Sequence, residues 1–192
     1  MAWLDAAVLY CDISGYTSLT NQTRNETVAR ILIAFHSSMV RITNHFNGRV
    51  FGFAGDRVMS VFSMADRNST VDAAISCALS MHSIVRYIIP EEFETRNFKP
   101  SLACTIGLDY GRVLMGRFGA GQSKDVVFVG DAANLAAKLQ AIASPDKSVV
   151  SNTVYDAFPS WITRSRWTSK NVNLSGVDVI CAYESGTYYT LE

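Results

Sequence analysis

The sequence predicts an α+β fold with a ferredoxin-like core, in which helices pack on a central, mostly antiparallel sheet. Three observations carry this prediction: an apolar run near the N-terminus, two long segments with helical apolar spacing, and short apolar or alternating segments around them. In order they give strand, helix, strand, strand, helix and strand, which is the βαββαβ arrangement. Further strands, another helix and a mixed tail are expected after this core.

The first strand is expected at residues 6–11, a nearly continuous apolar run that ends at Asp12. A run without alternation indicates a strand buried on both faces, in the centre of a sheet. A helix is expected next, because Thr23 and Glu26 have capping-box spacing. An apolar stripe with helical spacing then continues over residues 28–46.

The following segments predict a β-hairpin and a second helix. Two short strands, residues 49–53 and 58–62, flank a turn that carries Asp56 at its tip. The helix starts near Asn68 and is expected to end before Pro90.

The last part of the chain alternates apolar segments with turn signals. Strands are expected at residues 102–108, 113–115 and 126–129, and a helix at residues 132–143. Gly111 is expected to turn the first of these strands into the second, and Pro145 to stop the helix.

Composition and charge bound the function. A chain of 192 residues with 48% hydrophobic content has the size and core of one domain, taken as residues 1–192. Lys plus Arg and Asp plus Glu both count 17, so no bulk basic field favours nucleic acid. We expect no secretory signal and no membrane span, and a cytoplasmic protein. The cysteines are expected to be reduced core thiols: Cys11, Cys77, Cys104 and Cys181.

Two acidic residues stand at chemically suggestive places. Asp12 ends a buried strand and Asp56 lies at a hairpin tip, and a βαββ arrangement can make these elements sheet neighbours. Carboxylates that meet repel unless a positive group lies between them. Hard divalent cations prefer oxygen ligands, and Mg²⁺ commonly takes one or two protein carboxylates plus substrate phosphates. The alternative for Asp56 is a solvated turn residue, because Gly-Asp is common in turns.

The segment after Asp12 is a short glycine-containing turn before a helical segment. Its residues are Ser14, Gly15, Tyr16 and Thr17. Backbone N–H groups in such a turn could hold phosphate oxygens. The same combination also occurs by chance.

The helix after Gly130 carries a third polar signal. Asn134 and Lys138 are four residues apart, so they lie about 40° apart around the helix axis. Alanines border this strip and would let a ligand approach the backbone. The alternative is a solvated lysine with an incidental asparagine. The histidines, expected at the surface or its boundary, share no ligand spacing: His36, His45 and His82.

Four segments, in this order, resemble the catalytic domain of class III adenylate and guanylate cyclases. They are Val8–Thr17, Phe53–Asp56, Gly107–Gly116 and Val129–Leu139. The similarity extends from about Ala6 to Glu184, and it implies one cyclase catalytic domain with the α+β fold of that family.

The resemblance implies a two-metal site. Asp12 and Asp56, with the carbonyl of Ile13, would hold two divalent ions, Mn²⁺ or Mg²⁺. One ion would help the ribose 3′-hydroxyl to ionise and the other would bind the triphosphate.

The resemblance also implies roles for three residues farther along the chain. Arg112 would contact phosphates and Asn134 would orient the ribose. Lys138 stands where the family usually has an arginine, so it supplies the charge without the bidentate fork. Each active site in the family lies between two protomers, so a head-to-tail homodimer with two sites is expected and a monomer would be inactive.

The departures from the family pattern concern the base. The lysine that reads adenine would fall at Gly52, its Asp or Thr partner at Val127, and a phosphate lysine at Ser175. Hydrogen-bonding readout of a purine is therefore missing at both usual positions. Phe51, Phe53 and Arg57 are candidates for contacting a different base, although the two phenylalanines could belong to the core.

Several strings are similar to the Pycsar pyrimidine nucleotide cyclases of bacterial antiphage defence. They are Gly55–Met59, Gly130–Leu139, Leu9–Tyr10 and Pro159–Thr163. This resemblance implies a nucleoside triphosphate substrate, UTP or CTP, and cyclic UMP or cyclic CMP as product. Two alternatives stay open: a cyclase acting on ATP or GTP, and an inactive cyclase-homology module for dimerisation or nucleotide sensing.

Overall fold

A computed structural model describes residues 1–94, 100–120, 123–174 and 177–189. One eight-stranded sheet dominates it, with the strand order β2-β3-β1-β4-β6-β8-β7, and β5 pairs with β4 off this path. The strands are β1 (Ala2–Ile13), β2 (Arg49–Ala54), β3 (Arg57–Phe62), β4 (Cys104–Ala120), β5 (Ser123–Val129), β6 (Lys147–Ser151), β7 (Thr168–Leu174) and β8 (Val177–Ser185).

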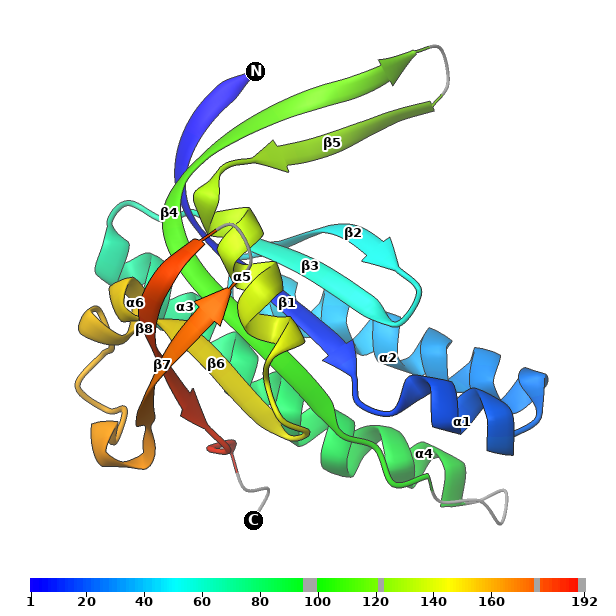
Figure 1. The fold of residues 1–192 in the computed structure, drawn as a ribbon. Coiled ribbons are helices and arrows are strands. Elements are labelled where there is room, and N and C mark those ends of the chain that lie inside the picture. The colour runs from blue at the N-terminus through cyan, green and yellow to red at the C-terminus, as the bar shows by residue number, and fades with distance from the viewer. Residues whose placement is uncertain (95–99, 121–122, 175–176, 190–192) are drawn as a thin grey trace.

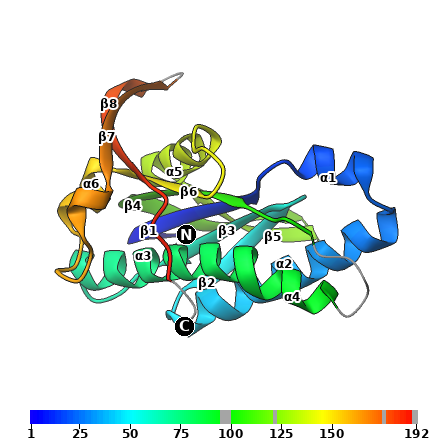
Figure 2. The same cartoon turned by 90° about the horizontal axis from the view of Figure 1, so that it is seen from below.

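Helices cover both faces of this sheet. They are α1 (Tyr16–Gln22), α2 (Asn25–His45), α3 (Arg67–Ser83), the π-helical turn η1 (Ile84–Ile88), α4 (Ile89–Glu94), α5 (Asp131–Ala141), α6 (Asn152–Asp156) and the 3₁₀ turn η2 (Arg164–Arg166). Figure 2 shows α2, α3 and α4 as one layer on one side of the sheet, and α5 on the other side.

The predicted ferredoxin-like core is present. Its elements follow one another as β1, α2, β2, β3, α3 and β4. The strands lie in the order β2-β3-β1-β4, and each neighbouring pair is antiparallel. The predicted hairpin appears as β2 and β3, with the turn between Ala54 and Arg57. The α+β prediction is therefore confirmed.

Alternation along β1 separates two apolar clusters. Leu9 and Cys11 point to the side of α2 and α3, here called the α2/α3 face, and join the largest core cluster. Ala6 and Val8 point to the other side, here called the α5 face, and pack with alanines of α5. Burial on both faces explains why this strand reads as a continuous apolar run.

The turn expected at Gly111 is wrong, because β4 passes through it as one strand of 17 residues. Ala6 is the ladder partner of Gly111, and β1 pairs with β4 from Ala2 to Ile13. A Cβ at Gly111 would lie 3.4 Å from the Cβ of Ala132, so a small residue suits the close approach of α5. The glycine thus reflects packing. Beyond it, β4 and β5 form a long hairpin that projects from the body (Figure 1).

Two helix boundaries also differ from expectation. α2 begins at Asn25 after an extended Arg24, and Thr23 instead ends α1, so the predicted capping box does not form. The helix expected to end before Pro90 continues, because the π turn η1 leads directly into α4. Pro90 therefore lies inside a continuous helix, directly after a π-helical turn in which the regular i→i−4 hydrogen-bond pattern is already interrupted. The start of α3 agrees with expectation, and the Asp66 side chain accepts a 2.9 Å hydrogen bond from the backbone N–H of Ser69.

His82 is a core residue, which corrects the expectation of a surface or boundary histidine. It is only 1% exposed. Its Nε2 lies 2.9 Å from Ser148 Oγ, and its Nδ1 lies 3.2 Å from Cys104 Sγ. Three of the four cysteines are buried free thiols as expected, whereas Cys181 is half-buried.

One continuous helix, Arg67–Phe93, is long and apolar enough to cross a membrane by length and composition. Within its most apolar window, 67% of the residues are buried inside the protein. It packs against the sheet and contributes Ile75, Leu79 and Met81 to the largest core cluster. Its hydropathy is therefore accounted for by core packing.

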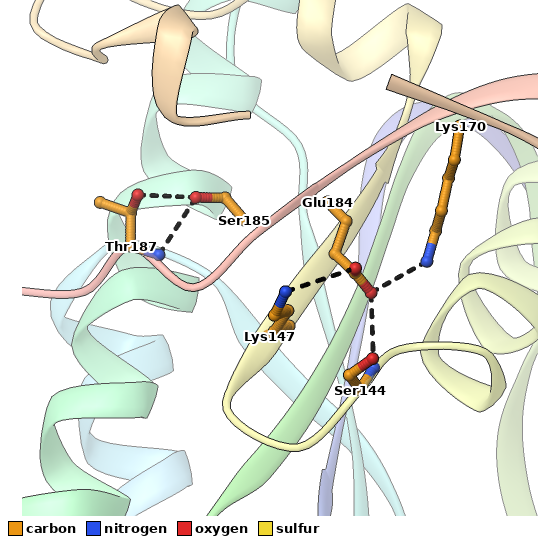
Figure 3. Close-up of polar contacts among 6 residues, drawn as sticks. All are labelled: Ser144, Lys147, Lys170, Glu184, Ser185 and Thr187. Atoms are coloured by element: carbon orange, nitrogen blue, oxygen red, sulfur yellow. Dashed lines mark hydrogen bonds and ion pairs between the residues drawn. The ribbon is translucent and has the colours of Figure 1, made fainter. Parts of the chain in front are cut away.

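A charged cluster links the three strands β6, β8 and β7 at one end of the sheet (Figure 3). Glu184 on β8 accepts from Lys170 Nζ at 2.9 Å and lies 3.7 Å from Lys147 Nζ. The backbone N–H of Ser144, in the loop after α5, also donates to Glu184 at 3.4 Å. These contacts connect β6, β7 and β8 to the C-terminal end of α5.

Candidate active site

Asp12 and Asp56 meet on the α5 face. Asp12 shares the alternation of Val8 and Tyr10 near the end of β1, and its ladder partner on β3 is Arg57. Asp56 lies in the turn just before Arg57, where Gly55 has a positive φ of 65° that glycine adopts readily. The hairpin therefore carries the second carboxyl group to the end of β1, and the two side chains interact directly.

The electrostatics of this pair favour a positive partner. Burial, followed by the adjacent carboxylate of Asp12, raises the pKa of Asp56 to about 6. Arg57 partly offsets this repulsion, with its Nη2 at 3.5 Å from Asp12 Oδ2. A hydrogen bond to the same oxygen comes from Gln140 on α5, whose Nε2 donates to it at 3.3 Å.

The donor set fits a hard divalent cation. Among the described residues, Asp12 Oδ1 is buried and has no hydrogen-bond partner. No cluster of three or more His, Cys, Asp or Glu side chains suited to a metal occurs within the described ranges. Two carboxylates completed by backbone and substrate oxygens are the arrangement that Mg²⁺ uses with phosphates. The Ile13 side chain points into the α2/α3 core, so its carbonyl is the only group it could offer.

The loop after β1 is shaped by Gly15, which has a φ of 72° and precedes α1. The backbone N–H of Ser14 donates to the carbonyl of Ala103 at 2.9 Å, so this N–H is engaged within the fold. Ser14 Oγ is buried and lacks a partner in the described part of the chain. Tyr16 packs against the core, and Thr17 is exposed at the start of α1. First-turn N–H groups of a helix have no intrahelical acceptor, so those of α1 suit a phosphate better than that of Ser14.

The backbone of helix α5 packs directly against strand β4. A Cβ at Gly107 would come within 2.2 Å of both the Ala136 carbonyl oxygen and the Gln140 nitrogen. Gln140 is 4% exposed and faces Asp12, whereas Asn134 is exposed and Lys138 is half-buried.

The rotation of α5 separates the polar residues that the sequence singled out. At 100° per residue, Lys138 points about 160° away from Gln140, and Asn134 about 120° away. Because Gln140 faces Asp12 of its own chain, Lys138 and Asn134 face elsewhere. One chain therefore brings Asp12 and Asp56 together but does not add Asn134 and Lys138 to them.

Arg112 also lies away from the carboxylates of its own chain. Its ladder partner on β1 is Asp5, seven residues before Asp12, which corresponds to about 23 Å along a strand. Its guanidinium lies 5.1 Å from the ring centroid of Trp3. The structure thus places Arg112 toward the projecting hairpin.

The positions expected to read a base lie on β2 and β5. A bulge at Phe51 shifts the register between β2 and β3. The Phe51 and Phe128 rings pack edge to face, with their centroids 4.7 Å apart. Their neighbours Gly52 and Val127 therefore belong to adjoining segments. A Cβ at Gly52 would meet no described atom within 4 Å, and Val127 is 38% exposed.

Two candidate base contacts, Phe53 and Arg57, lie elsewhere, and the position of the missing phosphate lysine falls outside the described residues. Phe53 is opposite Val58 in the ladder, and its ring centroid lies 4.6 Å from that of His36 on α2. Its side chain therefore points to the side of α2. Arg57 points at Asp12 and not at the base positions. Ser175 lies outside the described residues.

Comparison with known proteins identifies the family. The model of the adenylate and guanylate cyclase catalytic domain matches residues 3–185. The chain belongs to this family. The fold of this cyclase domain agrees with the adenylyl cyclase CyaB from P. aeruginosa, at a TM-score of 0.83 and 20% identity over 100% of this chain and 98% of that one. The guanylyl cyclase Cya2 gives a TM-score of 0.85 and 20% identity over 98% and 94%.

Curated relatives share more of the sequence. The uridylate cyclase of Rhodovulum sp. (strain MB263) is 31% identical over 159 residues, which are 80% of this chain and 65% of that protein. The uridylate cyclase of Burkholderia cepacia is 33% identical over 139 residues, 72% and 59% of the two chains. An adenylate cyclase of Anabaena cylindrica is 26% identical over 136 residues, 70% of this chain and 26% of that one. The cyclase domain thus spans about three fifths of the length of the uridylate cyclases it matches.

Residues that the sequence pattern did not single out complete the site. Gln140 contacts Asp12 and also donates to Thr105 Oγ1 at 2.8 Å. The sequence feature that could have indicated Gln140 is a polar residue on the side of α5 that otherwise buries alanines. His36 holds the hairpin tip, with its Nε2 at 3.0 Å from the Gly55 carbonyl oxygen. That contact depends on the placement of α2 beside the hairpin and left no local signal.

Proposed function

We propose that this cyclase domain converts a pyrimidine nucleoside triphosphate, UTP or else CTP, into the 3′,5′-cyclic nucleotide and pyrophosphate, and so acts as a phosphorus-oxygen lyase. The observation that carries the proposal is the contact between Asp12 and Asp56 at the end of β1, in the fold of a cyclase catalytic domain. Class III cyclases generally use two divalent ions, which polarise phosphate oxygens and lower the pKa of the attacking hydroxyl.

The protein groups have separate tasks in this reaction. Asp12, Asp56 and the Ile13 carbonyl would hold the two ions, Mn²⁺ or Mg²⁺. First-turn N–H groups of α1, beginning at Tyr16, would bind phosphate oxygens. The ribose 3′ oxygen forms a bond to the α-phosphorus while the bond to pyrophosphate breaks, and the 3′ proton passes to solvent. The negative charge on the α-phosphate oxygens would be met by Lys138.

The orientation of α5 supports a site shared between two chains. Gln140 faces Asp12 of its own chain, so Asn134 and Lys138 point away from that carboxylate, as a site completed by a second chain would require. A head-to-tail homodimer would bring Asn134 to the ribose and Lys138 to the α-phosphate at the carboxylates of its partner. It would form two such sites, to which Arg112 could add a phosphate contact. A monomer would then be inactive.

The base preference rests on two positions and on the relatives. Gly52 has no side chain and Val127 offers no hydrogen-bonding group, so the readout that a purine would receive there is absent from both. The uridylate cyclases named above share 31% and 33% of the aligned residues. Cyclic UMP, or else cyclic CMP, is the proposed product. The corresponding role is synthesis of an antiphage second messenger in the cytoplasm, by a protein that binds neither nucleic acid nor membrane.

A product assay tests this proposal. The purified protein is incubated with Mn²⁺ or Mg²⁺ and each of ATP, GTP, UTP and CTP, and the products are separated by mass-resolved chromatography. Cyclic UMP or cyclic CMP should dominate. Cyclic AMP or cyclic GMP as main product would contradict the pyrimidine assignment and leave the cyclase assignment standing.

A second candidate function has a specific observation in its favour. Lys138 replaces the usual arginine, and Arg57 pairs with the carboxylate that a cation would need. A nucleotide-sensing or dimerisation module would bind triphosphate or a partner without releasing pyrophosphate. Nucleotide binding without any cyclic product under either metal would favour this module over the enzyme.

A further inference from the structure

Gln140 lies where an alanine would complete the packing of α5. The helix buries Ala132, Ala133 and Ala136 against the sheet, and Gln140 follows one turn later on the same side. Its Nε2 donates to Thr105 Oγ1 at 2.8 Å and to Asp12 Oδ2 at 3.3 Å. Its Oε1 is buried and has no partner in the described part of the chain. Burying an unsatisfied amide oxygen costs stability, so the residue is not explained by packing.

The position of this amide is set by the backbone of the helix. At Gly107, α5 and β4 approach so closely that a Cβ would overlap the nitrogen of Gln140. Thr105 is the ladder partner of Asp12 on β4, so the strand that supports α5 also carries the second acceptor of the amide. The close packing of α5 on β4 therefore fixes the position from which the Gln140 side chain contacts Asp12.

The contact selects one oxygen of Asp12. Gln140 Nε2 and Arg57 Nη2 both approach Oδ2. Oδ1 is buried and unpartnered as far as the described residues show. Holding Oδ2 between two donors fixes the plane of the carboxylate and leaves Oδ1 for a cation, as outer hydrogen bonds do for metal ligands generally.

We propose that Gln140 is a positioning residue, which orients the Asp12 carboxylate for the divalent cation of its own chain. The inference rests on the proposed function in one respect, that Asp12 binds a metal. It gives α5 two tasks: its buried side holds the carboxylate of its own chain, while Asn134 and Lys138 on its other side serve the partner.

The first test measures metal binding without nucleotide. Gln140→Met keeps the length and volume of the side chain but removes the donor. By calorimetric titration of the apoprotein, Mn²⁺ affinity should fall about tenfold. The melting temperature should stay equal or rise, because the unsatisfied Oε1 is removed as well. A lower melting temperature with unchanged Mn²⁺ affinity would show a purely structural residue and overturn the proposal.

A matched pair at Thr105 sharpens this result. Thr105→Val removes the hydroxyl that fixes the amide, whereas Thr105→Ser keeps it. The valine variant should lose Mn²⁺ affinity a few-fold and the serine variant should match the wild type. Combined with Gln140→Met, Thr105→Val should add nothing further, because both act through one amide. Fully additive losses would contradict a shared path to Asp12.

Hybrid dimers show which carboxylate Gln140 serves. One chain carries Asp12→Asn and the other Lys138→Ala, so the only complete site combines the carboxylates of the second chain with α5 of the first. Gln140→Met added to the second chain should raise the Mn²⁺ concentration needed for half-maximal activity, and added to the first chain it should not. The reverse pattern would overturn the proposal. An inactive hybrid together with a calorimetric loss in Gln140→Met would contradict the shared site and support Gln140 as a positioning residue.

Discussion

The two faces of the sheet differ in where buried polar atoms without a hydrogen-bond partner lie. On the α2/α3 face, the buried side chains of His82 and Thr43 have partners, with Thr43 Oγ1 at 2.9 Å from Ser60 Oγ, although Trp167 Nε1 in the same core cluster has none among the described residues. On the α5 face, the buried oxygens without a partner in the described residues belong to two side chains in contact with each other, Asp12 and Gln140. Two neighbouring unpartnered oxygens beside a second carboxylate are what a cation site requires, whereas a single indole N–H is not. The comparison teaches that the position of an unpartnered polar atom, and not its mere presence, distinguishes a candidate site from a core.

The largest expected effect comes from the carboxylates on the α5 face. Asp12→Asn or Asp56→Asn should reduce turnover by about 10³-fold or more, because the ligands of the ions are lost. The fold should stay intact, since each change removes one of two repelling charges. Turnover is measured as pyrophosphate release, and circular dichroism and size-exclusion chromatography report fold and assembly. Activity within tenfold of the wild type would contradict the assignment of these residues.

The next largest effect concerns how α5 lies on the sheet. Gly107→Ala should destabilise the protein by about 3 kcal/mol or more, because the new Cβ would overlap backbone atoms that cannot yield cheaply. The matched control is Gly52→Ala, whose Cβ meets no described atom within 4 Å. That control should leave stability within about 0.5 kcal/mol. Urea denaturation of both variants measures the difference, and equal losses would show that α5 is not tightly seated on β4.

The sequence predicted those features that local pattern decides. The βαββαβ order followed from apolar periodicity, and Asp12 and Asp56 were recognised because each stands at the end of an apolar segment. Their meeting followed from topology, since β1 and β3 are neighbours in such a core.

What the sequence could not predict depends on partners distant in the chain. β4 runs through Gly111 because β1, about 100 residues earlier, provides its ladder. His82 is buried because Ser148 and Cys104 accept or donate to its ring from two strands. Arg57 pairs with Asp12 only once β1 and β3 are in register. In each case a residue with an exposed or turn-forming tendency is overruled by tertiary contacts.

The smallest effect expected here contrasts one buried titratable group from each face. Burial lowers the pKa of His82 on the α2/α3 face to about 4. Burial raises the pKa of Asp109 to about 6; this residue on β4 points to the α5 face and lies 2.5 Å from Ser151 Oγ. As pH falls from about 6.5 to 4, the unfolded chain protonates His82 before the folded chain does, so stability decreases. As pH rises from about 4 to 6, the unfolded chain ionises Asp109 first, so stability decreases in the other direction.

Each displacement corresponds to up to about 3 kcal/mol, so between pH 4 and pH 6 the slopes of His82 and Asp109 oppose each other, and Asp56, whose pKa is also raised to about 6, adds to the slope of Asp109. Asp109→Asn should remove the Asp109 slope, raising stability at pH 7 and leaving the loss on acidification from His82 opposed only by Asp56. His82→Gln should do the opposite, leaving stability that falls as pH rises from 4 to 6. Urea denaturation at pH 4.5, 5.5, 6.5 and 7.5 compares the three proteins. If Asp109→Asn kept the pH dependence of the wild type, the ionisation of this buried acid would have no part in stability, and the contrast between the faces would reduce to the unpartnered oxygens beside Asp12.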